Sequence, residues 1–133
     1  MQAQNSEAAA PPIYLLDSEA DTISDLAWTS RDRFPDVCDM LMDEIGRATL
    51  CSPDDLPENV VTMGTEVEYR DERSESSRRI QLVYPNHADV EQGRISILTP
   101  VGAALLGLQA GTSIVWPDRD GGLHSLSVER VFR

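Results

Sequence analysis

Lysine is absent from this sequence of 133 residues, so its positive charge comes from 11 arginines alone, against 23 acidic residues. The formal net charge is −12 at pH 7. Residues 1–59 hold 13 of the acids and only 3 of the arginines, which makes the front half the more acidic one. Because such a surface repels phosphate groups, no direct binding to nucleic acid is expected. A basic protein surface is the more natural partner.

The sequence also has few cysteines and no long apolar run. Cys38 and Cys51 lack the Cys-x-x-Cys spacing of redox and zinc motifs, and both are predicted to be free thiols. No apolar run approaches the ~18 residues of a membrane span. The first residues lack the basic and apolar regions of a secretory signal. We therefore expect a cytoplasmic protein with no membrane association and a disordered leader over residues 1–12.

Motifs of catalysis and cofactor binding are missing as well. The sequence has no Gly-rich phosphate loop and no nucleophile elbow, and Cys38 has no His near it in the chain. His87 and His124 lack a cluster of Cys or carboxylates at ligand spacing, so no metal is expected. Trp28 and Trp116 belong to no RNA-binding aromatic pattern and are predicted to anchor the core. We expect no catalytic residue and no cofactor.

The front half does contain helical patterns. Residues 13–16 are typical of a short strand. Ser18 offers an N-cap for an amphipathic helix predicted to end near residue 30. Pro35 suits the first turn of a second helix, predicted over residues 35–50. A tight turn between the two predicts a short antiparallel helical hairpin within residues 13–58.

After residue 60 the hydrophobic period changes from about 3.6 to about 2. The alternating segments predict a mostly antiparallel sheet of four or five strands. One short helix interrupts it, with Thr99 as N-cap, Pro100 at its first position, and Gly107 or Gly111 at its end. Its leucines are expected to fill the core. Residues 59–133 thus form the sheet part of an α+β protein.

This second half resembles the C-terminal domain of the Gre-type transcript cleavage factors. The resemblance rests on the segments VTMGTEVEY, RRIQLVYP, GRISILTPVGAALLGLQAGTSIVW and LSVERVF. It implies an FKBP-like fold for residues 59–133. The segments IYLLDSEADTISDL and CSPDDLPENVVTM are similar to the regulator of nucleoside diphosphate kinase family, the Rnk branch of the GreA/GreB superfamily.

The resemblance implies RNA polymerase as the partner, bound near the entrance of its secondary channel. The family's docking element lies at the start of the short helix, which corresponds here to Leu98, Thr99 and Pro100. Leu98 departs from family members that carry an acid at that position. We expect a monomeric, non-catalytic regulator of transcription elongation that competes with Gre-type factors. A protein-binding FKBP-like module with another partner stays open as an alternative.

Three acids, Asp32, Asp36 and Asp39, gather near the predicted hairpin turn. Two of them fall at the start of a helix, where the macrodipole favours acids, although all three could instead project into a partner. In the cleavage factors an acidic pair lies at the tip of a long coiled-coil stalk and reaches the Mg²⁺ centre of the polymerase. A helix of about 15 residues spans only ~22 Å. We therefore predict no transcript cleavage, with a short-stalk cleavage factor as the alternative.

Overall fold

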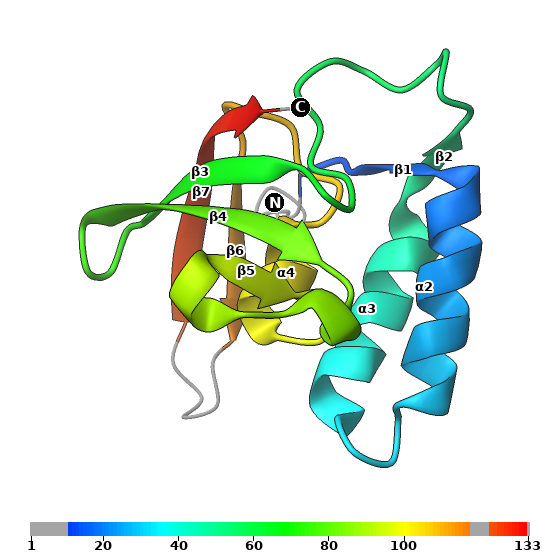
Figure 1. Ribbon diagram of the computed structural model, residues 1–133. Helices are drawn as coiled ribbons and strands as arrows, with labels where there is room; N and C mark the ends of the chain where they lie inside the picture. Colours follow the sequence, from blue (N-terminus) through cyan, green and yellow to red (C-terminus); the bar gives the residue numbers. More distant parts are fainter. Residues whose placement is uncertain (1–10, 118–122, 133) are drawn as a thin grey trace, which may run out of the picture.

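The computed structural model describes residues 11–117 and 123–132 (Figure 1). Its elements are, in order, β1 (Tyr14–Leu16), α2 (Asp17–Thr29), α3 (Pro35–Arg47), β2 (Thr49–Cys51), β3 (Glu66–Asp71), β4 (Ser76–Val83), η1 (Pro85–His87), η2 (Val90–Gln92), β5 (Arg94–Ser96), α4 (Pro100–Leu105), β6 (Ser113–Pro117) and β7 (Leu123–Phe132). The predicted α+β class is confirmed. Residues 1–10 of the expected leader lie outside the described residues.

The second half of the chain forms a five-stranded sheet in the order β5-β4-β3-β7-β6. Every neighbouring pair is antiparallel except β4 and β5, which run parallel, so the predicted mostly antiparallel sheet is confirmed. The 3₁₀ turns η1 and η2 carry the chain back between these two strands. The register of β3 against β7 shifts between Glu68 and Tyr69, which marks a β-bulge.

Helices α2 and α3 pack against each other and run antiparallel beside the sheet (Figure 1). The predicted N-cap at Ser18 is wrong: α2 begins at Asp17, because the chain enters the helix directly from β1. α3 begins at Pro35 as predicted but ends at Arg47 instead of continuing to residue 50, because the next residues leave as β2. Within the part of the chain that the structure describes, no helix has the length and apolar character of a membrane span.

Strands β1 and β2 form a parallel pair, and β2 was not predicted from the sequence. The N–H of Thr49 donates to the carbonyl of Ile13 over 3.0 Å, and the N–H of Tyr14 donates to the carbonyl of Gly107 over 3.1 Å. β1 therefore joins the end of the hairpin to the chain that follows α4. Gly107 has a φ of +82°, and a Cβ there would lie 3.0 Å from the Cβ of Ile13. This close approach requires a glycine.

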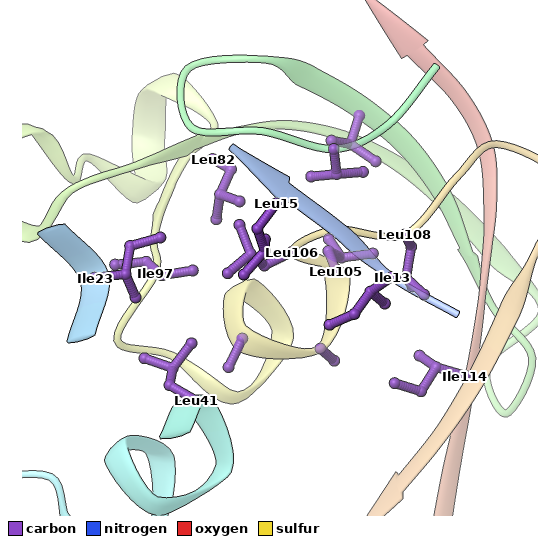
Figure 2. Close-up of a cluster of buried hydrophobic side chains, with 14 of the residues drawn as sticks. Ile13, Leu15, Ile23, Leu41, Leu82, Ile97, Leu105, Leu106, Leu108 and Ile114 are labelled. Carbon is purple, nitrogen blue, oxygen red and sulfur yellow. The ribbon is translucent and has the colours of Figure 1, made fainter. Parts of the chain in front are cut away.

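The hydrophobic core runs through both halves of the chain (Figure 2). β1, α2, α3, the sheet, α4 and the residues next to them contribute fully buried side chains, among them Ile13, Leu15, Ile23, Leu41, Leu82, Ile97, Leu105 and Leu106. The prediction that the leucines of the short helix fill the core is confirmed. Full burial of one such side chain contributes about 1.5–3 kcal/mol. The hairpin and the sheet consequently depend on the same packing around α4.

Candidate functional site

The segment that leads into α4 is fixed by its own hydrogen bonds. Thr99 is the N-cap, as predicted: its hydroxyl accepts from the N–H of Gly102 over 3.1 Å and donates to the carbonyl of Ser96 over 2.7 Å. Pro100 takes the first helical position, where its missing N–H sacrifices no hydrogen bond. Thr99 and Pro100 are half-buried, so each still presents part of its surface to solvent.

Leu98 has a different environment from its two neighbours. Its side chain is only 7% exposed and belongs to the hydrophobic core. Its N–H donates to the hydroxyl of Ser96 over 2.9 Å. The part of the predicted docking segment that solvent reaches is therefore formed by Thr99 and Pro100, with Leu98 packed beneath them.

Gly102 explains why α4 can lie so close to the end of β5. A Cβ on Gly102 would lie 2.4 Å from the carbonyl oxygen of Ser96 and 3.1 Å from the Oγ1 of Thr99. Ala103 and Ala104, which follow it, are fully buried. Small residues thus let the first turn of α4 pack directly on the backbone, which holds Thr99 and Pro100 in place.

The turn between α2 and α3, residues 30–34, is also internally bonded. Ser30 is 2% exposed, and its carbonyl accepts from the N–H of Arg33 over 3.1 Å and from the N–H of Phe34 over 3.0 Å. The carbonyl of Phe34 accepts in turn from the N–H of Cys38 over 3.0 Å. These bonds tie the turn to the ends of both helices.

The three predicted acids lie around this turn. Asp32 is in the turn itself, Asp36 is in the first turn of α3, and Asp39 follows at the start of the same helix. All three side chains are exposed. Among the ion pairs found in residues 11–117 and 123–132, none involves them. Their carboxylates are therefore presented to solvent.

Two aromatic residues stand beside these acids. Trp28 is 64% exposed, so the prediction that it anchors the core is wrong; the buried face of α2 is instead formed by smaller side chains such as Ala27. Phe34 is 42% exposed. The guanidinium of Arg31 lies 4.4 Å from the ring centre of Trp28, and that of Arg33 lies 5.5 Å from the ring centre of Phe34. The side chain of Trp116 lies outside the described residues.

The start of α4 and the turn between α2 and α3 lie toward the same end of the molecule, the lower end in Figure 1. α3 packs against α4, and Leu41 of α3 lies beside α4 in Figure 2. The two segments singled out from the sequence are thus carried by elements that share one core. The turn projects beyond α4 in this view.

A shallow cleft with a volume of about 620 Å³ lies elsewhere, where the start of α2 meets the end of β4. Its lining includes Glu19, Met63, Tyr84, His87 and Arg94. Burial, and next the charge of Glu19, raises the pKa of Tyr84. No sequence motif pointed to this cleft, because its lining comes from several separate segments.

The remaining reactive side chains of the described residues include two thiols and His124. Cys38 and Cys51 are free, as predicted, and both are buried. Burial, and next the charge of Asp39, raises the pKa of the Cys38 thiol, which keeps it protonated. In the described part of the chain, no three His, Cys, Asp or Glu side chains lie close enough to hold a metal ion. His124 has its Nδ1 4.0 Å from an Asp71 carboxylate oxygen.

Known proteins resemble this chain over most of its length. The family model for the C-terminal part of the transcription elongation factors GreA and GreB matches residues 56–131. A regulator of nucleoside diphosphate kinase from Escherichia coli strain K12 is 38% identical over 106 residues, which cover 80% of this chain and 78% of that protein. A solved transcription elongation factor GreA/GreB from Nitrosomonas europaea is 37% identical and has a TM-score of 0.72. That match covers 92% of this chain and 99% of the other.

The likeness to full GreA factors is more partial. The transcription elongation factor GreA of Thermodesulfovibrio yellowstonii is 36% identical over 74 residues. These residues cover 56% of this chain but only 47% of that factor. The chain thus matches about half the length of such a GreA protein.

Proposed function

The chain belongs to the GreA/GreB family, in the branch of the regulators of nucleoside diphosphate kinase, and from this premise we propose that it is a non-catalytic regulator of transcription elongation. In this proposal it binds RNA polymerase near the secondary channel as a monomer and competes there with Gre-type factors. The observation that carries the proposal is the half-exposed, internally bonded start of α4, at Thr99 and Pro100.

The start of α4, at Thr99 and Pro100, is held rigidly, which favours it as the docking element. The hydroxyl of Thr99 is bonded on both sides, and Leu98 is packed in the core beneath it. A surface that is already ordered loses little conformational entropy when a partner binds. Docking at Thr99 and Pro100 would therefore combine partner contact with the structural role of capping α4.

The short hairpin favours regulation without cleavage. α3 has 13 residues, which at ~1.5 Å per residue makes it about 20 Å long. Asp32, Asp36 and Asp39 at its start would then stay well short of the catalytic metal of a polymerase whose channel accepts a long stalk. We infer that the hairpin, residues 13–58, projects beside a docking domain formed by residues 59–133, which we infer to be FKBP-like.

The net charge of −12 fits a protein partner. Binding of this acidic chain to a nucleic acid would release no counterions, so nothing would drive the association. Contact with RNA or DNA is therefore not part of the proposal. The polymerase surface that receives it is expected to be basic, with attraction that weakens as salt is raised.

A competition experiment tests the proposal. Core RNA polymerase is titrated with the protein at moderate salt, and a Gre-type factor is then added. We expect saturable binding that the factor displaces, and no transcript cleavage when a backtracked complex is incubated with the protein. Absence of binding at micromolar concentrations would contradict the proposal, and cleavage would favour a short-stalk cleavage factor.

Two substitutions locate the contact. Pro100→Arg adds a positive charge at the start of α4, facing a surface that is expected to be basic, so binding should weaken; the fold should persist, because the N-cap hydrogen bond is made by Thr99. Ser74→Arg adds the same charge in the exposed β3–β4 turn and serves as its matched control. Equal binding by the two variants would exclude Pro100 from the interface.

A further inference from the structure

The shallow cleft between the start of α2 and the end of β4 is not used by docking through α4. Its volume is about 620 Å³, and the described residues that line it belong neither to α4 nor to the turn between α2 and α3. We propose that this cleft binds a small zwitterion, an amino acid or short peptide with free ends and an apolar side chain. The inference is independent of the proposed function, because it rests only on the residues that line the cleft.

Charged side chains of both signs line the cleft, and they come from three separate segments. Glu19 lies in the first turn of α2, His87 lies in η1, and Arg94 begins β5. A zwitterion has one charge of each sign, so its ammonium group can pair with Glu19 while its carboxylate pairs with Arg94. The lining therefore matches both ends of one molecule.

Arg94 is the side chain that we expect to hold the carboxylate. It is exposed, and within the described residues its guanidinium takes part in no ion pair and no ring contact. Arg47 and Arg79, by contrast, each pair with a glutamate. The planar guanidinium group presents its donors in a fork that fits a carboxylate. His87, on the lining of the same cleft, can donate a further hydrogen bond.

Glu19 is the side chain that we expect to hold the ammonium group. Its Oε1 accepts from the N–H of Met63 over 3.2 Å, which anchors the side chain to the segment that precedes β3. Burial, and next the charge of Glu19, raises the pKa of Tyr84, so the carboxylate lies close to that hydroxyl. A carboxylate has about four acceptor sites, so Glu19 can hold an ammonium group and keep its bond to Met63.

Apolar side chains in the lining supply a wall for the side chain of the ligand. Met63 and Tyr84 are half-buried, and Val83 is only 7% exposed. The wall is held in place by its neighbours, since the Nε2 of Gln81 donates to the carbonyl of Gly64 over 3.0 Å. A cleft that is already ordered binds a ligand with little loss of conformational entropy.

Other small ligands fit less well. Nucleotides and inorganic phosphate have the same sign as a chain whose net charge is −12, and a carboxylate stands in the cleft itself. An uncharged apolar compound would use the wall of Met63, Val83 and Tyr84 but would pair with neither charged side chain. A zwitterion is neutral as a whole, so the acidic protein does not repel it.

Titration with peptides of leucine is the first test, followed by amide shifts in nuclear magnetic resonance spectra of the whole protein. Leucine, dileucine and trileucine are compared with dileucine that is acetylated at its amino end or amidated at its carboxyl end. We expect the best zwitterion to bind with a Kd on the order of 0.1–1 mM, and each blocked form to bind about 10-fold more weakly. The amides of Met63 and Arg94 should shift most.

Three outcomes of this titration overturn the proposal. The first is no saturable shift with any of the three zwitterions up to about 10 mM, far above the expected Kd. The second is equal binding of dileucine and its blocked forms, which would leave the charged ends without a role. The third is tighter binding of adenosine monophosphate or inorganic phosphate, which would make the cleft an anion site.

Variants of the two charged side chains locate the site. Arg94→Gln removes the positive charge, and Glu19→Gln removes the negative charge while keeping an oxygen that can accept from Met63. Arg78→Gln removes a positive charge from an exposed position of β4 outside the cleft and is the matched control. We expect each cleft variant to bind dileucine about 10-fold more weakly and the control to bind like the wild type. Arg94→Gln should unfold at the same temperature as the control, because its side chain is exposed. Equal binding by these two variants overturns the proposal.

Discussion

Replacing Gly102 by alanine should destabilise the protein, although the same change in an open helix usually stabilises it. The new Cβ would lie 2.4 Å from the carbonyl oxygen of Ser96, whereas carbon and oxygen atoms in contact need about 3.3 Å. α4 and β5 must therefore separate by roughly 0.9 Å, the difference between these two distances. The hydrogen bond from the Thr99 hydroxyl to the Ser96 carbonyl spans the same gap and weakens with it.

The magnitude follows from three contributions. Overpacking of a tight contact costs about 1–3 kcal/mol, and the weakened hydrogen bond between Thr99 and Ser96 costs up to about 1 kcal/mol. The reduced entropy of the unfolded chain returns about 0.4–1 kcal/mol. The expected loss is about 2 kcal/mol, which for a chain of this size lowers the midpoint of thermal unfolding by about 6–10 °C.

Gly46 provides the matched control for this experiment. It lies in α3, and a Cβ there would meet no atom within 4 Å. Gly46→Ala should raise the free energy of unfolding by about 0.5 kcal/mol, because alanine has the higher helix propensity. Urea and thermal unfolding followed by circular dichroism measure both variants. If Gly102→Ala were as stable as Gly46→Ala, the close packing of α4 on the backbone of Ser96 would be refuted.

Substitutions at three other positions test separate contacts. Thr99→Val removes both hydrogen bonds of the hydroxyl and should cost about 1–2 kcal/mol in urea unfolding, while Thr99→Ser retains most of the stability; equal losses would deny the cap its role. Gly107→Ala places a side chain at φ +82° against β1, so hydrogen exchange at the amide of Tyr14 should accelerate more than at the centre of the sheet. Burial raises the pKa of Tyr69 above the 10.0 of a free phenol. As pH rises past about 10 the unfolded chain releases this proton first, so stability should fall, and Tyr69→Phe should flatten the decline in unfolding free energy; an unchanged slope would exclude Tyr69 as its source.

Local chemistry made the start of α4 predictable. Thr99 acts through hydrogen bonds to residues within three positions, and Pro100 acts through its own ring at the first helical position, so their roles follow from sequence alone. The alternation around Val67 and Tyr69 likewise predicted a strand with one buried face. These features need no knowledge of what packs against them.

Features that depend on distant partners could not be read from the chain. β2 is a strand because β1 lies beside it, and its own three residues carry no strong signal. Trp28 looks like a core residue by type, but the space beside α2 is filled by other side chains. The inward direction of Leu98 follows from the core beneath α4, which the sequence pattern did not resolve.

The bond between Tyr14 and Gly107 joins residues that lie far apart in the sequence. During synthesis, β1 cannot take this place until residue 107 has been made, although α2 and α3 are complete long before. The hairpin therefore cannot complete its packing until the later part of the chain has been synthesised. Ile13 and Leu15 lack their final neighbours for most of translation. A nascent chain that stops before α4 should lack a stable fold, and such truncated products should be open to proteolysis.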